Sequence, residues 1–182
     1  MDAVLDSVVI QHLVRSPRKK KRGKNPDKFE TQIDIAIKQG RLRVCVDANR
    51  SLTSEWERTC SQEVIRVLET TWMEWGGIHI VTGMKKLPGS VSQQLARMNF
   101  RRAAVDKLIL QIAMAMNACC VVSEDSDFWD PTDVKSVGDL NARVARYCRE
   151  TLRIQILLLL HLLKRLGLSR VPGPRGKRRL RR

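Results

Sequence analysis

Short, almost fully apolar segments alternate with amphipathic helical segments along this chain, and that alternation is what most constrains its fold. Four segments predict strands: 42–47 (LRVCVD), 78–83 (IHIVTG), 118–122 (ACCVV) and 153–160 (RIQILLLL). Strands that lack alternating polar positions are buried on both faces, which is typical of parallel sheets. We therefore expect an α/β fold, a three-layer α/β/α sandwich around a central, mostly parallel sheet of four or five strands.

The segments between these strands carry apolar residues at the spacing of a helix that rests on a sheet. They predict helices over 27–40, 54–75, 90–100, 103–117, 139–152 and 161–167. One continuous helix over 140–167 is the alternative to a strand followed by a short helix. The strand is favoured because the Ile and Leu run has no polar positions at helical spacing.

The formal net charge of +15 is concentrated in two flanking segments. Residues 15–28 hold eight Lys or Arg against one Asp, and residues 170–182 hold seven Lys or Arg and no acid. Such segments bind polyanions through counterion release, with nucleic acid favoured here over an anionic membrane. The predicted organisation is an N-terminal extension over 1–40, an α/β domain over 41–168 and a basic tail over 169–182. The candidate nucleic-acid-binding residues are Arg18, Lys19, Lys20, Lys21, Arg22, Arg175, Lys177, Arg178, Arg179, Arg181 and Arg182.

Cysteine usage and hydropathy indicate the cellular compartment expected for this chain. The five cysteines are odd in number and lack CxxC spacing, which favours a reduced, cytoplasmic chain without a zinc site. The apolar run over 154–163 is too short to span a bilayer, so no transmembrane segment is expected.

Carboxylates follow two of the predicted strands. Asp47 closes the first strand, and Asp125 and Asp127 follow the third. In parallel sheets, ligands bind at the carboxyl ends of the strands, so these acids are expected to meet at one edge. Asp106 can join them from the helix before the third strand, and Glu55 from the helix after the first.

A cluster of carboxylates in one cleft calls for a cation, because like charges raise one another's pKa. Mg²⁺ and Mn²⁺ prefer oxygen ligands and complete their shells with water and substrate phosphate. A carboxylate cleft of this kind beside basic segments predicts a metal-dependent enzyme that hydrolyses phosphodiester bonds with a metal-activated water.

Three segments, VDAN at 46–49, VDKLILQIAMAMNACCVV at 105–122 and SEDSDFW at 123–129, together resemble the PIN-domain nucleases over about residues 43–160. The resemblance implies a ribonuclease, or less often a DNA nuclease, that leaves a 5′-phosphate and a 3′-hydroxyl. The implied ligands of Mg²⁺ or Mn²⁺ are Asp47, Asp106, Asp125 and Asp127. Ser123 would hold the first carboxylate or a bound water, and Asn49 would shape the loop after the first strand.

Members of this family are frequently toxins, so the resemblance also implies an inhibitory antitoxin or a larger defence assembly as partner; a homodimer is compatible with it. Glu55 directly precedes Trp56, as in some PIN-like relatives, and is favoured as the helix carboxylate, with Glu57 as the alternative. Glu124 is expected to face solvent. Two other functions stay open: a Toprim-like nuclease acting on DNA, whose pattern needs a Glu where Asp47 stands, and a non-catalytic nucleic-acid-binding scaffold with a PIN-like fold.

Overall fold

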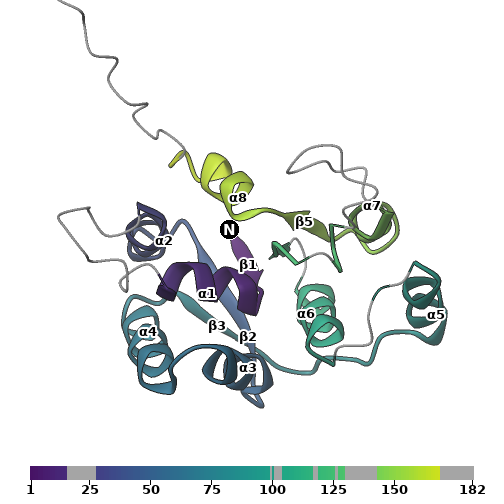
Figure 1. The fold of residues 1–182 in the computed structure, drawn as a ribbon, viewed down its shortest axis with the longest axis horizontal. Coiled ribbons are helices and arrows are strands. Elements are labelled where there is room, and N and C mark those ends of the chain that lie inside the picture. The colour runs from purple at the N-terminus through teal and green to yellow at the C-terminus, as the bar shows by residue number, and fades with distance from the viewer. Residues whose placement is uncertain are drawn as a thin grey trace, which may run out of the picture.

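A computed structural model describes residues 1–15, 28–98, 100, 104–116, 119–125, 127–129 and 143–168. This part of the chain contains one five-stranded sheet in the order β3-β2-β1-β4-β5, and every pairing is parallel (Figure 1). The strands are β1 (Asp2–Leu5), β2 (Arg43–Asp47), β3 (Ile78–Val81), β4 (Cys120–Val122) and β5 (Gln155–Leu157).

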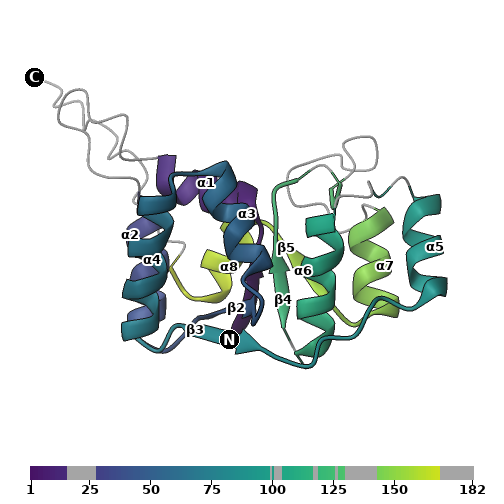
Figure 2. The same ribbon diagram turned by 90° about the horizontal axis from the view of Figure 1, so that it is seen from below.

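Helices connect successive strands and cover the sheet. They are α1 (Ser7–Arg15), α2 (Lys28–Lys38), α3 (Ser51–Thr59), α4 (Gln62–Glu74), α5 (Gly89–Arg97), α6 (Ala104–Ala115), α7 (Arg143–Thr151) and α8 (Leu159–Arg165). In Figure 1, α8 lies on one side of the sheet, and α3 and α6 lie on the other. Figure 2 shows α2 and α4 side by side at the end of the sheet where β3 lies. The predicted three-layer α/β/α architecture with a parallel sheet is confirmed.

The middle strand of the sheet comes from the N-terminal segment, for which the sequence predicts an extension. β1 pairs with β2 on one side and β4 on the other, and its last three residues are fully buried. The following helix α1 buries Val9, Ile10 and Leu13. The predicted boundary at residue 40 is therefore wrong for β1, α1 and α2, which build the sheet and its cover. Only three apolar residues stand between Asp2 and Asp6, which is shorter than the runs that predicted the other strands.

Two further boundaries differ from the prediction. The helix expected over 54–75 is two helices, because Cys60 is extended and α4 begins anew after Ser61. The strand expected over 153–160 is limited to β5, and α8 starts two residues after it. A continuous helix over 140–167 is ruled out, since β5 pairs in register with β4.

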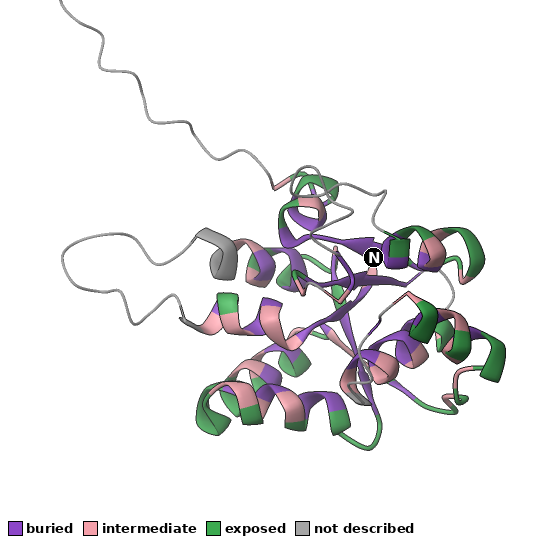
Figure 3. Ribbon diagram, turned by 45° about the vertical axis from the view of Figure 1, so that its right-hand side comes forward, coloured by how far each residue is buried: buried purple, intermediate pink, exposed green. Residues whose placement is uncertain are grey.

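The core lies between the sheet and its helices (Figure 3). Its largest fully buried side chains include Trp56 from α3, Trp72 from α4 and Phe128 after β4. None of the described helices has the length and apolar character needed to cross a membrane. Six polar or charged side chains are also buried in the described part, and most of them lie near the carboxyl ends of the strands: Asp6, Asp47, Thr53, Glu69, Asp106 and Ser123.

Candidate carboxylate site

The strand order reverses beside β1, and this is where an open α/β sheet forms its crevice. The chain moves from β1 to β2 and β3 on one side, and then returns to place β4 and β5 on the other. Leu5 pairs with Val122, so the next residues, Asp6 and Ser123, leave the sheet at the same level. The crevice position predicted for a ligand is therefore lined by the residues that follow β1 and β4.

Asp6 is held at this position by Ser123. The Ser123 hydroxyl donates a hydrogen bond of 2.5 Å to Asp6 Oδ2, and the Ser7 hydroxyl donates one of 3.2 Å to Asp6 Oδ1. Ser123 Oγ also accepts the backbone N–H of Asp125 at 3.0 Å. Burial raises the pKa of Asp6, and the neighbouring charge of Asp125 raises it further. Ser123 thus joins a buried carboxylate after β1 to the segment after β4.

Asp106 completes the group from the first turn of α6, where it is buried. The pKa of Asp106 is raised to about 7, first by burial and then by the neighbouring charges of Asp6, Asp125 and Asp127. A hydrogen bond with Asp127 acts in the same direction. These four residues, called here the switch-point carboxylates, are therefore close enough to perturb one another's protonation.

The segment that carries Asp125 and Asp127 is a tight turn fixed by aromatic residues. The backbone N–H of Asp127 donates to Asp125 Oδ1 at 2.9 Å, and those of Phe128 and Trp129 donate to the Asp125 carbonyl. Phe128 packs edge to face on Phe100, with 5.2 Å between ring centroids. The Trp129 indole N–H donates to the Ser123 carbonyl at 2.8 Å, so this ring belongs to the core. Hydrogen bonds to Asp125 therefore tie the backbone of Asp127, Phe128 and Trp129 to the residue that follows Glu124.

Asp47 lies at the same edge of the sheet but has a different environment. Its Oδ2 accepts the backbone N–H of Ser51 at 2.9 Å, and its Oδ1 accepts that of Leu52 at 2.8 Å. Both oxygens therefore satisfy the first turn of α3, as a helix-capping carboxylate does. Asn49 is exposed in the intervening turn. Arg50, which follows it, has a left-handed backbone conformation with φ of 59°.

The glutamates of α3 are ion-paired with arginines. Glu55 accepts two hydrogen bonds from Arg58, at 2.6 and 2.8 Å. Glu57 lies 3.4 Å from Arg50, whose guanidinium also donates to the buried Glu69 at 2.9 Å. Neither Asp47 nor these glutamates are among the groups that contribute most to the pKa of Asp106.

The structure therefore brings Asp106, Asp125 and Asp127 together, as predicted, and adds Asp6, which was not among the predicted site residues. The signal for Asp6 was present in the sequence, because AVLD at 3–6 has the same form as VCVD at 44–47. Glu124 is exposed, as expected, but it also pairs with His12 of α1, with 3.0 Å between Oε2 and Nδ1.

The switch-point carboxylates suit a hard cation in their chemistry. Among the residues that the structure describes, no three or more His, Cys, Asp or Glu side chains converge on one ion position. The donor set is nevertheless entirely oxygen. Burial and the repulsion among these carboxylates both raise the pKa of Asp106, and a divalent cation would relieve the repulsion. The eleven basic residues predicted to bind nucleic acid, at 18–22 and 175–182, all lie outside the described residues.

Comparison with protein-family models, with curated protein sequences and with solved structures found no match to this chain. A fold class alone does not define an activity, so the function has to be argued from the chemistry of the site.

Proposed function

We propose that this protein is a metal-dependent endonuclease of the PIN-like type, with RNA as the favoured substrate. The observation that carries the proposal is the raised pKa of Asp106, about 7, which results from burial beside three other carboxylates. Buried acids whose pKa is shifted by a specific set of like charges, at the crevice of an α/β sheet, are typical of functional sites.

The proposed metal ligands are Asp6, Asp106, Asp125 and Asp127. This set differs from the one expected from the sequence, because Asp6 takes the place of Asp47, whose oxygens bind the N-terminus of α3. Glu55 is retained as an auxiliary acid. It lies on α3, which packs against α6, and its partner Arg58 is largely exposed, so their ion pair separates at little cost.

A bound Mg²⁺ or Mn²⁺ would supply a water of lowered pKa and neutralise charge on the attacked phosphate. The residues of this chain hold and orient that site. Ser123 fixes the carboxylate of Asp6 and, through its oxygen, the backbone of Asp125. Asp106 holds a proton up to about pH 7, so a cation held by this carboxylate below that pH would displace the proton. The basic segments add a sequence-independent attraction to phosphates.

The direct test is an assay of the full chain, freed of metal with a chelator, on single-stranded RNA, single-stranded DNA and flap DNA. With Mg²⁺ or Mn²⁺ restored, we expect RNA cleavage that leaves a 5′-phosphate and a 3′-hydroxyl. Asp125→Asn should abolish cleavage while binding through the basic segments persists. Cleavage that continues in chelator, or in Asp125→Asn, would overturn the proposal, and binding of all three substrates without cleavage would favour the scaffold alternative.

A further inference from the structure

A histidine and a glutamate form an ion pair beside the switch-point carboxylates. His12 Nδ1 is 3.0 Å from Glu124 Oε2. His12 belongs to α1, which begins directly after Asp6. Glu124 stands between Ser123 and Asp125 in the segment after β4. The pair therefore makes a second contact between the segments that follow β1 and β4, in addition to the hydrogen bond from Ser123 to Asp6.

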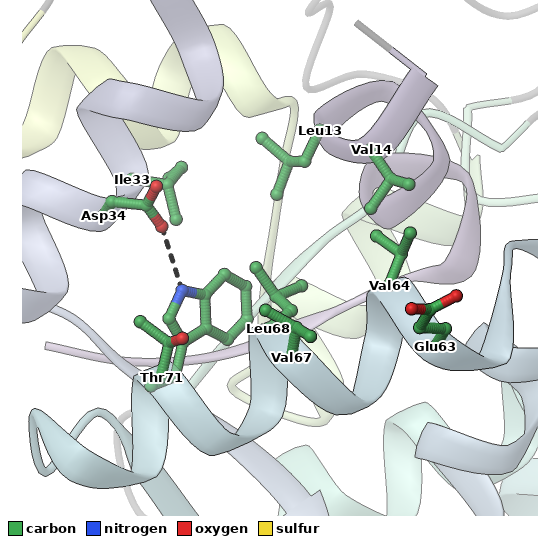
Figure 4. Close-up of a pocket in the computed structure, with 10 residues that line it drawn as sticks. Leu13, Val14, Ile33, Asp34, Glu63, Val64, Val67, Leu68 and Thr71 are labelled. Carbon is green, nitrogen blue, oxygen red and sulfur yellow. Dashed lines mark hydrogen bonds between the residues drawn. The ribbon is translucent and has the colours of Figure 1, made fainter. Parts of the chain in front are cut away.

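Helix α1 directs His12 away from the residues that follow it. Leu13 and Val14 line an apolar groove together with residues of α2 and α4 (Figure 4). His12 is not part of that lining, and its ring lies against Glu124 instead. The side chains of His12 and Glu124 are 51% and 31% exposed. The pair is therefore open to a ligand that approaches the switch-point carboxylates from solvent.

One ring nitrogen of His12 is left for such a ligand. Nδ1 faces Glu124, and Nε2 lies on the other side of the imidazole. Within the described part of the chain, Nε2 has no hydrogen-bond partner. Nε2 donates a hydrogen bond when the imidazole is protonated, and it accepts one when the ring is neutral with its proton on Nδ1. A ligand group that both donates and accepts hydrogen bonds therefore suits Nε2 in both states.

The substrate favoured for this site carries a group of that kind. The 2′-hydroxyl of RNA donates and accepts hydrogen bonds, and it is the group by which a protein distinguishes RNA from DNA. Glu124 directly precedes Asp125, and the Cα atoms of adjacent residues are about 3.8 Å apart. The partner of Glu124, His12, is therefore placed to meet a nucleotide close to the scissile phosphate.

We propose that His12 Nε2 binds the 2′-hydroxyl of one nucleotide near the scissile bond, so that His12, oriented by Glu124, selects RNA over DNA. The inference rests on the proposed nuclease activity of the switch-point carboxylates. In that reaction a metal-activated water attacks the phosphate, and the 2′-hydroxyl takes no part in the bond changes. Removal of a single 2′-hydroxyl therefore reports on recognition of the substrate and not on the chemical step.

Cleavage by the full chain of one RNA, and of variants with a single 2′-deoxy nucleotide at each position around the cut, tests this. At one position, kcat/KM of the wild type should fall roughly three- to tenfold, as expected for one hydrogen bond. His12→Ala should lose the same factor on the unmodified RNA and lose nothing more on that 2′-deoxy variant. Glu124→Ala should lose part of the dependence at the same position, because the ring is no longer oriented.

His79→Ala is the matched control. His79 lies on β3, which β2 separates from β1, so this variant should keep the full dependence on the 2′-hydroxyl. Calorimetric titration of Mn²⁺ into His12→Ala should match the wild type, because His12 is not proposed to contact the metal.

Four results would overturn the inference while the proposed function stands. Cleavage depends on no single 2′-hydroxyl, His12→Ala keeps that dependence, His79→Ala loses it equally, or His12→Ala loses Mn²⁺ binding. A wild-type protein that cleaves no RNA would instead contradict the proposed function, and the inference would fall with it.

Discussion

Two groups of acids lie at the carboxyl edge of this sheet, and they differ in what surrounds them. After β2, the carboxylates of Asp47 and Glu69 are buried against backbone N–H groups and an arginine, respectively. After β1 and β4, the switch-point carboxylates face one another, and the pKa of Asp106 rises to about 7. An acid at the end of a strand is therefore not a site by itself, because the groups that balance its charge decide its role.

The largest expected effect separates the two groups by activity. Asp106→Asn should lower the rate of metal-dependent cleavage at least about 1,000-fold, equivalent to about 4 kcal/mol, because it removes a proposed ligand. Asp47→Asn should stay within about tenfold of the wild type. Single-turnover cleavage of a labelled RNA measures both, and equal losses would erase the distinction between the groups.

The next effect is on the pH dependence of stability. In the folded protein Asp106 keeps its proton up to about pH 7, whereas the ordinary value of 3.8 applies when the chain unfolds. The folded state therefore binds more protons between these values, and the free energy of unfolding should fall as pH rises through this window. The slope is at most about 1.4 kcal/mol per pH unit for one group.

Asp106→Asn should flatten that slope. Urea denaturation in chelator at pH 5 and at pH 7 measures it, and the difference between variant and wild type isolates this carboxyl from the other groups that titrate. An unchanged slope would show that Asp106 is not perturbed in the way described.

A smaller effect is expected for the stability contributed by Asp47. Asp47→Ala removes the acceptor of two backbone N–H groups of α3 and should cost about 1–2 kcal/mol of unfolding free energy, as loss of a helix cap does. The midpoint of urea denaturation measures this loss. Glu124→Gln is the control, since that carboxylate is exposed, and a stability of Asp47→Ala equal to that of the control would contradict the capping role.

Variants of Glu55 test whether an acid of α3 acts together with the switch-point carboxylates. Glu55→Gln should lower cleavage about tenfold with little change in stability, because its partner Arg58 is 72% exposed. Glu57→Gln should leave cleavage unchanged. The reverse order of the two variants would make Glu57 the helix carboxylate.

Much of the fold follows from local pattern, and the part that does not is instructive. β2, β3 and β4 were recognisable as apolar runs with polar ends, and α6 as a regular amphipathic helix. β1 was missed because its apolar run is three residues long, and its place in the centre of the sheet depends on pairing with two distant segments. The break between α3 and α4 was missed because no Gly or Pro marks Cys60 and Ser61.

The site was predictable to a similar degree. Asp106, Asp125 and Asp127 follow from their positions beside one buried strand. Asp47 has the same sequence pattern as Asp6, and only the backbone geometry of α3 shows that its oxygens are already used. The sequence pattern shows which strand an acid follows. It does not show which groups contact that acid, because they come from segments far away in the sequence.

Calorimetric titration of Mn²⁺ into metal-free protein tests the central claim most directly. Wild type and Asp47→Asn should bind Mn²⁺ with similar affinity, and Asp106→Asn should lose binding, because the metal is proposed to lie among the switch-point carboxylates. If all three proteins bind alike, if none binds, or if Asp47→Asn loses binding while Asp106→Asn keeps it, the metal centre is not the one described.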